Sequence, residues 1–254
     1  MLNTERIFPM EKGFQQARPF WFRAIKKLIV IRYKRPRFVF LGKRFDKSSI
    51  ILSNHVGTDG PLTLELYCDK PIRFWGASEM NSGLIPTYKY LSEVYYHQKK
   101  HWNLHLARLF CLIGAPVSNL FYKGLHLIST YRDARFLKTL NESLRALKDG
   151  NNIVIFPEDS SDGYHDELKA FHLGFGMLCD FCRRAGIDLP IYVTYFRKSD
   201  LTYIVDEPIL YSELCKNGAT KEEIAARLLT RCNELGKLDV DALPEKAEKT
   251  AICG

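Results

Sequence analysis

Short apolar runs alternate with longer segments of helical periodicity along this chain, and this alternation restricts the fold more than any other feature. The runs bounded by polar or turn residues predict strands at residues 37–41, 49–53, 71–77, 125–129, 152–156, 189–196 and 202–210. The other segments predict helices at 18–33, 61–68, 84–122, 133–148, 169–185 and 220–235. Strands separated by helices predict an α/β fold, a three-layer sandwich with a mixed, largely parallel sheet flanked by helices.

Two of the predicted strands end in polar side chains. The run at 50–53 leads into His55 and Asp59, and the run at 152–156 leads into Glu158. Because loops at the carboxyl ends of strands form the site in such sheets, we expect one shared site. Histidine changes charge near neutral pH, and a carboxylate on its second nitrogen fixes the tautomer. Such a pair is typical of a general base that takes a proton from a hydroxyl.

Structural roles are the alternatives for these residues. An Asp just before Pro61 and an apolar run is also an ordinary helix start, in which Asp59 caps the helix. The polar residues 159–163 equally fit a turn whose side chains bond their own backbone. Both alternatives stay open at this point.

The order of several short motifs resembles one known family. Asn54-His55 followed by Asp59, and Phe156-Pro157-Glu158, resemble the first and third motifs of the 1-acylglycerol-3-phosphate acyltransferases. Further similar landmarks lie within residues 37–211, in the same order as in the family, at 37–42, 148–150, 171–174, 189–193 and 207–209. The resemblance implies transfer of a fatty acyl group from an acyl thioester, either acyl-CoA or acyl carrier protein, to a hydroxyl of a lysophospholipid or related glycerolipid.

The resemblance also implies roles for particular residues. His55 and Asp59 are the expected catalytic residues, with no metal and no cofactor besides the thioester co-substrate. The expected substrate-binding residues are Asn54, Arg132, Glu158, Ser160 and Ser161. Glu158 would position the acceptor, with the two serines as hydroxyl donors.

The chain departs from the family pattern in three places. Three residues rather than four separate His55 from Asp59, although the glycines in that loop give it freedom to adapt. Arg132 stands at a longer spacing than the usual arginine of the second motif, and Arg135 competes with it.

The third departure concerns charge. The family's Glu-Gly-Thr-Arg is replaced here by residues 158–161, Glu-Asp-Ser-Ser, which lack the arginine that suits a phosphate group. The acceptor could therefore carry a sugar, a zwitterionic head group or another hydroxyl, with Arg132 or Lys123 supplying positive charge.

The basic residues concentrate near the start of the chain. The net charge is +8, and eleven basic residues stand between Arg18 and Lys47 against one acid, Asp46. Because aromatic and aliphatic residues alternate with these cations, we interpret 1–36 as a basic amphipathic segment that contacts an anionic membrane surface. The alternative is a basic surface helix docked on the core. The acyltransferase domain is expected at 37–236, and a loosely ordered tail at 237–254.

The remaining features favour a cytoplasmic protein that associates peripherally with a membrane. Seven cysteines, an odd number, fit a reduced compartment, and the first residues do not resemble a signal peptide. We expect no transmembrane helix, because His105, Arg108 and Pro116 interrupt the apolar region 104–122. Histidines 97, 101 and 105 could share a helical face and bind a metal, but Trp102 and the neighbouring lysines fit an interfacial helix better. The apolar residues that follow could instead form part of an acyl-chain groove.

Other functions remain as hypotheses. A catalytically silent lipid- or membrane-binding protein of the same fold is favoured by the shortened His-to-Asp spacing and the missing arginine. A serine esterase is opposed by the lack of a Gly-x-Ser-x-Gly motif. Nucleic acid is not an expected partner, because the basic segment has no recognisable binding motif.

Overall fold

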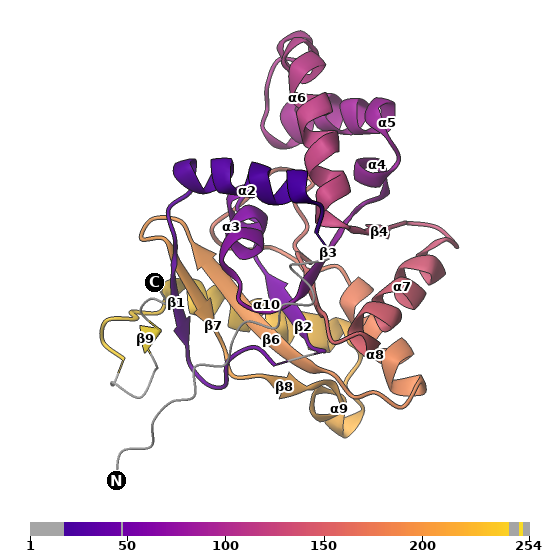
Figure 1. The fold of residues 1–254 in the computed structure, drawn as a ribbon. Coiled ribbons are helices and arrows are strands. Elements are labelled where there is room, and N and C mark those ends of the chain that lie inside the picture. Colours follow the sequence, from indigo (N-terminus) through magenta and orange to yellow (C-terminus); the bar gives the residue numbers. More distant parts are fainter. Residues whose placement is uncertain (1–17, 47, 244–248, 251–254) are drawn as a thin grey trace.

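A single mixed sheet forms the centre of the molecule. The computed structural model describes residues 18–46, 48–243 and 249–250. In this part of the chain nine strands pair in the order β4-β3-β5-β2-β6-β7-β1-β9, with β8 on β6 (Figure 1). The strands are β1 (Arg37–Phe40), β2 (Ile50–Ser53), β3 (Ile72–Ala77), β4 (Ile128–Thr130), β5 (Asn152–Ile155), β6 (Pro190–Arg197), β7 (Thr202–Val205), β8 (Ile209–Leu210) and β9 (Lys249–Thr250).

Strand direction decides where the site lies. The neighbours β4, β3, β5, β2 and β6 run parallel, with Ile51 of β2 opposite Val154 of β5 and Tyr192 of β6. β7 is antiparallel to β6 and parallel to β1, and β8 and β9 pair antiparallel. The carboxyl ends of β2 and β5 therefore meet at the same edge of the sheet.

Helices cover both faces of this sheet. They are α2 (Phe20–Arg32), α3 (Asp59–Tyr67), α4 (Ser78–Asn81), α5 (Leu84–Lys89), the π-helical η1 (Tyr90–Lys99), α6 (Leu104–Leu125), α7 (Phe136–Lys148), α8 (Gly174–Arg184), α9 (Tyr211–Leu214), the 3-10 turn η2 (Lys216–Gly218) and α10 (Lys221–Lys237). Alternate strand residues pack on opposite faces. Ile50 and Leu52 join a core with α7, α8 and α10, whereas Ile51 joins a second core with Phe22 of α2 and Leu64 of α3. The predicted three-layer α/β sandwich is therefore confirmed.

The basic helix α2 is docked on the core along one side. Phe22 is fully buried, and a Cβ at Gly124 of α6 would overlap the Phe22 ring. Arg18 and Lys26 both form ion pairs with the buried carboxylate of Glu65, at 3.2 and 3.1 Å. One face of α2 thus matches the alternative of a docked surface helix. Residues 1–17 of the predicted amphipathic segment lie outside the described residues.

Two predicted elements divide or shorten for local reasons. The strand expected at 202–210 is split into β7 and β8, because Pro208 lacks the N–H that a continuous ladder needs. The helix expected at 169–185 begins only at Gly174. The residues before it pair with the loop after β5 instead, where Phe171 forms a bridge with Glu158. Of the expected tail, 244–248 and 251–254 lie outside the described residues, while Lys249–Thr250 forms β9.

The apolar region after residue 103 forms one continuous helix within the helical region expected at 84–122. α6 spans 22 residues with Pro116 inside it, and it is long and apolar enough to cross a membrane. His105 and Arg108 do not interrupt it, because both lie in its first two turns. In Figure 1, α5 and α6 project beyond the sheet. The surrounding helices bury only 22% of the most apolar window of α6.

Candidate functional site

The end of β2 is held rigidly before the chain turns toward the site. The buried Asn54 amide donates to the Phe196 carbonyl at 3.0 Å and accepts from the Phe196 N–H at 2.7 Å. These two bonds join the carboxyl end of β2 to β6. The amide of Asn54 is thus engaged with backbone, and its substrate contact stays a prediction.

A tight turn brings the chain back over His55. Val56 and Gly57 both adopt left-handed backbone angles, with φ of 46° and 65°. Left-handed angles are rare for a β-branched residue such as valine, so the surrounding structure must hold this turn. A Cβ at Gly60 would lie 2.6 Å from the His55 carbonyl oxygen, so only glycine permits this close approach.

Asp59 takes neither of the two positions that the sequence suggested. Its Oδ2 lies 2.6 Å from Nζ of Lys198, in the turn between β6 and β7. Thr58, not Asp59, is the N-cap of α3, and no side chain caps that helix. The buried Nδ1 of His55 has no hydrogen-bond partner among the described residues. The shortened spacing therefore leaves the His55–Asp59 pair unformed.

Two aromatic rings enclose the imidazole of His55. Its centroid lies 4.7 Å from that of Phe156 and 5.1 Å from that of Tyr164, with an angle of 28° between the His55 and Tyr164 planes. Burial, followed by the positive charge of Lys99, lowers the pKa of His55 to about 4. The imidazole is therefore neutral at physiological pH, as a general base must be.

Glu158 joins the two loops that the sequence placed at one edge of the sheet. Its Oε1 accepts a hydrogen bond from the His55 backbone N–H at 3.0 Å. The flanking segment is fixed by pairing with residues 170–172. Burial raises the pKa of Glu158 to about 7, and the His55 N–H and the charge of Lys99 oppose that rise. This carboxyl group therefore gains and loses a proton near neutral pH.

Lys99 is a site residue that sequence reasoning missed. It ends the π-helix η1, and its Nζ donates to Oγ of Ser160 at 2.6 Å. Burial lowers the pKa of Lys99; the charge of Glu158 raises it and that of Arg132 lowers it. The only sequence signal was a pair of lysines at 99–100, which we read as part of an interfacial helix.

Of the other predicted substrate-binding residues, Arg132 and Ser160 lie at the site, whereas Ser161 lies in a turn. Arg132 follows β4 at the same edge of the sheet, and its charge acts on Lys99. Its competitor Arg135 instead pairs with Asp133 at 2.7 Å. Ser161 is exposed, and its N–H bonds the Asp159 carboxylate at 3.0 Å, as the turn alternative predicts. Ser160 is the serine that faces the cation.

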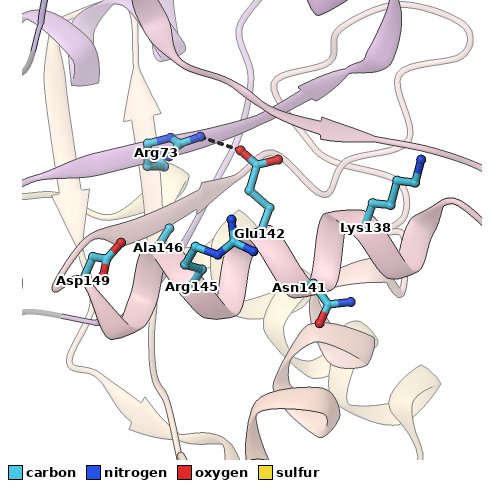
Figure 2. A pocket seen from close by; sticks show the side chains of 7 residues that line it. All are labelled: Arg73, Lys138, Asn141, Glu142, Arg145, Ala146 and Asp149. Atoms are coloured by element: carbon cyan, nitrogen blue, oxygen red, sulfur yellow. Dashed lines mark hydrogen bonds and ion pairs between the residues drawn. The ribbon is translucent and has the colours of Figure 1, made fainter.

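A polar cavity of about 430 Å³ lies beside the His55 loop. It is lined by residues 56–59, Tyr95, Lys100, residues 164–166 and Lys198. A second hollow of about 400 Å³ lies against α7, where Arg73 forms an ion pair with Glu142 at 2.8 Å (Figure 2). That hollow contains none of the predicted site residues, so the cavity beside His55 is the one that adjoins the site.

The described residues contain no group of three His, Cys, Asp or Glu side chains that could hold a metal ion. The histidines at 97, 101 and 105 do not share one helical face, because η1 ends at Lys99 and α6 begins at Leu104. Nδ1 of His97 instead lies 2.8 Å from the Trp102 carbonyl oxygen.

The chain is thus an α/β protein in which a neutral histidine and a protonatable glutamate meet at the carboxyl edge of the sheet. No protein-family model matches it, and no curated protein matches its sequence. Its fold is similar to the crystal structure of the 1-acyl-sn-glycerophosphate (LPA) acyltransferase PlsC from Thermotoga maritima, with a TM-score of 0.48 and 13% identity. The alignment covers 91% of this chain and 83% of that one. At this identity the likeness is one of general fold and says nothing of substrate or mechanism.

Proposed function

We propose that this chain is an O-acyltransferase that moves a fatty acyl group from acyl-CoA or acyl carrier protein to a hydroxyl of a lysophospholipid or related glycerolipid. The observation that carries the proposal is the hydrogen bond of 3.0 Å between the His55 N–H and Glu158. It joins the two loops whose motifs resemble those of the acyltransferase family. The enclosed, neutral imidazole between them supports the role of a base.

The chemistry follows from these groups. Nε2 of His55 takes the proton of the acceptor hydroxyl as that oxygen attacks the thioester carbonyl. The C–S bond breaks, the ester forms, and the proton passes from the imidazolium to the departing thiolate. Glu158 positions the acceptor hydroxyl. Asp59 would orient His55 only after leaving Lys198.

The cations at this edge of the sheet support binding of an anionic substrate group. Among the described residues, Lys99 donates to a serine hydroxyl and lies over the Tyr164 ring. None of the three cations Lys99, Lys100 and Arg132 forms an ion pair with a described residue. Two acids, Glu158 and Asp159, act on Lys99, and the three cations exceed these two acids in number. This arrangement substitutes cations from η1 and the loop after β4 for the arginine that residues 158–161 lack.

Exposed apolar side chains support a peripheral membrane partner. On α2, Phe20 and Ile31 are 78% and 84% exposed, beside exposed Arg23, Lys27 and Arg32. α6 exposes the large apolar residues Leu106, Leu109, Phe110, Leu112, Ile113, Val117 and Leu120. The α2 and α6 helices touch through Phe22 and Phe121, whose ring centroids are 5.1 Å apart. An anionic bilayer would cover both apolar faces and meet the cations at its surface.

The test is acyl transfer with purified protein. The wild type is incubated with a labelled long-chain acyl-CoA or acyl carrier protein and a panel of lysolipids, and products are separated. His55→Ala should lower transfer by about 10²–10⁴-fold, the usual contribution of a general base, while circular dichroism stays unchanged. His126→Asn is the matched control, because this exposed histidine precedes β4 at the opposite edge of the sheet and asparagine tolerates its left-handed backbone angle. Full transfer by His55→Ala would reject the mechanism.

A catalytically silent lipid-binding protein is the second candidate. The ion pair of Asp59 with Lys198 favours it, because a carboxylate held there cannot orient His55. Binding to anionic vesicles without any consumption of thioester would support this function. Free thiol without acyl-lipid product would indicate a thioesterase instead.

A further inference from the structure

No side chain of the described residues forms a hydrogen bond that would fix the orientation of the His55 ring through Nδ1. That nitrogen is buried without a hydrogen-bond partner in the part of the chain that the structure describes, and the partner predicted from the sequence, Asp59, is paired with Lys198. A base whose ring rotates freely loses much of its rate advantage, since catalysis depends on a held geometry. Something else must therefore hold the ring.

Aromatic packing supplies that restraint from both sides. The inner ring, Phe156, is itself anchored in the core, stacked on Phe74 with centroids 6.2 Å apart. The outer ring, Tyr164, lies nearly parallel to the imidazole. Offset stacking of this kind stabilises a pair of rings beyond the area that it buries.

Tyr164 is in turn held in place by its own loop and by η1. The ammonium groups of Lys99 and Lys100 lie over its ring, at 5.4 and 5.3 Å from the centroid. Such cation–π contacts stabilise the ring position. The preceding Gly163 has a φ of 118°, a backbone angle that L side chains rarely adopt, and this turn directs the next residue back over the site.

We propose that Tyr164 is the positioning residue of His55, and that stacking against Phe156 and Tyr164 takes the place of a carboxylate in orienting the imidazole. The proposal rests on the proposed acyl transfer, in which His55 is the base. Tyr164 does not itself touch the reacting atoms. It holds the ring plane fixed, so that Nε2 faces the acceptor, and it keeps water from Nδ1.

The first test is a histidine titration that does not depend on turnover. The His55 ring signal is followed by NMR against pH in protein labelled at histidine carbons, and it is assigned by its loss in His55→Ala. The charged or titratable groups around the ring are Lys99, Lys100, Glu158 and Tyr164. In the wild type the titration should fall near 4, because the ring is enclosed. A wild-type titration near 6.5 would overturn the proposal without any variant.

Variants of the outer ring separate positioning from other roles. Tyr164→Ala should raise the His55 pKa by at least about 1, because water reaches the ring. Tyr164→Phe keeps the stack and should leave the titration within about 0.3 of the wild type. Asp59→Asn should also leave it unchanged, whereas a large change there would show that Asp59 orients the ring and would overturn the proposal.

Turnover gives the second measurement. Tyr164→Ala should lower kcat about tenfold or more with KM changed less than about threefold, and Tyr164→Phe should restore kcat. Faster turnover in Tyr164→Ala would mean that Tyr164 is a lid that covers the base, and would overturn positioning. If no variant and no wild-type protein turns over, the acyltransferase function fails, while the titration still decides the role of Tyr164.

Discussion

The carboxyl edge of the sheet and the helix α6 both depart from the usual distribution of side chains. The edge encloses ionisable side chains, whereas α6 exposes apolar ones. At the edge, His55 and Glu158 are enclosed, so that their pKa values move to about 4 and about 7. On α6, Leu106 and Ile113 are 62% and 78% exposed. Buried ionisable groups and exposed apolar faces both cost free energy in water. Each region is therefore better explained by a ligand or surface that it meets than by its contribution to stability.

The two regions are joined through η1. The end of η1 places Lys99 and Lys100 at the site, and α6 packs against η1 over much of its length. A bilayer that covers α6 would therefore contact a helix that packs directly against η1, whose end supplies the cations of the site. Substitutions can separate the two regions, because stability, membrane binding and proton binding respond to different changes.

The largest expected effect is on membrane binding. Changing Leu109, Ile113 and Val117 together to lysine should weaken binding to anionic vesicles by about 10³-fold. Each apolar side chain that enters the bilayer contributes about 1.5–3 kcal/mol to the binding free energy. Sedimentation with vesicles measures this. Since all three side chains are exposed, the free energy of unfolding should change by less than about 0.5 kcal/mol.

The matched control adds the same charge elsewhere. Lysines at Asn141, Ala226 and Thr230, exposed positions on α7 and α10, should leave vesicle binding intact or strengthen it slightly. Equal vesicle binding by the α6 variant and the control would contradict the proposal that the exposed apolar face of α6 binds the membrane.

The next effect is on stability. Leu52→Ala, in the fully buried strand β2, should lower the free energy of unfolding by about 2–5 kcal/mol through the cavity it leaves. The same change at Leu109 should cost less than about 0.5 kcal/mol, because that side chain is 66% exposed. Urea unfolding followed by circular dichroism compares them. Similar losses would mean that α6 is part of the hydrophobic core.

A smaller effect concerns the buried carboxyl group. Because the pKa of Glu158 is about 7 in the folded protein and about 4.5 when unfolded, the native state binds more protons between these values. Stability conferred by Glu158 therefore falls as pH rises through that window. Glu158→Gln should raise the free energy of unfolding by about 3 kcal/mol at pH 8 and leave it unchanged at pH 4.

The control for Glu158 is an exposed acid. Glu222→Gln, at the start of α10, should alter the free energy of unfolding by less than about 0.5 kcal/mol at either pH. A gain from Glu158→Gln that is the same at pH 4 and pH 8 would contradict the idea that ionisation of this carboxyl group is costly.

The smallest effect concerns the ion pair at the mouth of the cavity. Lys198 is 65% exposed, so Lys198→Met should cost less than about 1 kcal/mol of stability. A double-mutant cycle with Asp59→Asn measures the coupling in urea unfolding. Coupling above about 2 kcal/mol would mean that the Asp59–Lys198 pair stabilises the loop after His55. Asp59 would then not readily leave Lys198 to pair with His55.

The fold class could be predicted from the spacing of apolar residues over short stretches of sequence. The apolar runs around Ile51 and Val154 predicted parallel strands, and periodic segments such as 220–235 predicted helices, because side-chain spacing alone decides which face is buried. The same patterns predicted that the His55 and Glu158 loops would meet. A helix expected within residues 84–122 also forms as α6, although Pro116 lies inside it, and α6 packs against η1 and α5.

The details of the site depended on distant segments. Neither Lys99 nor Tyr164 lies in a motif around His55, yet both come within contact of this site. Asp59 pairs with Lys198 because the β6–β7 turn approaches the start of α3, which the spacing of residues 55–59 could not reveal. Sequence by itself therefore determined the elements and the edge of the sheet that holds the site. Only the tertiary structure decided which side chains meet there, because those contacts join residues that are far apart in the chain.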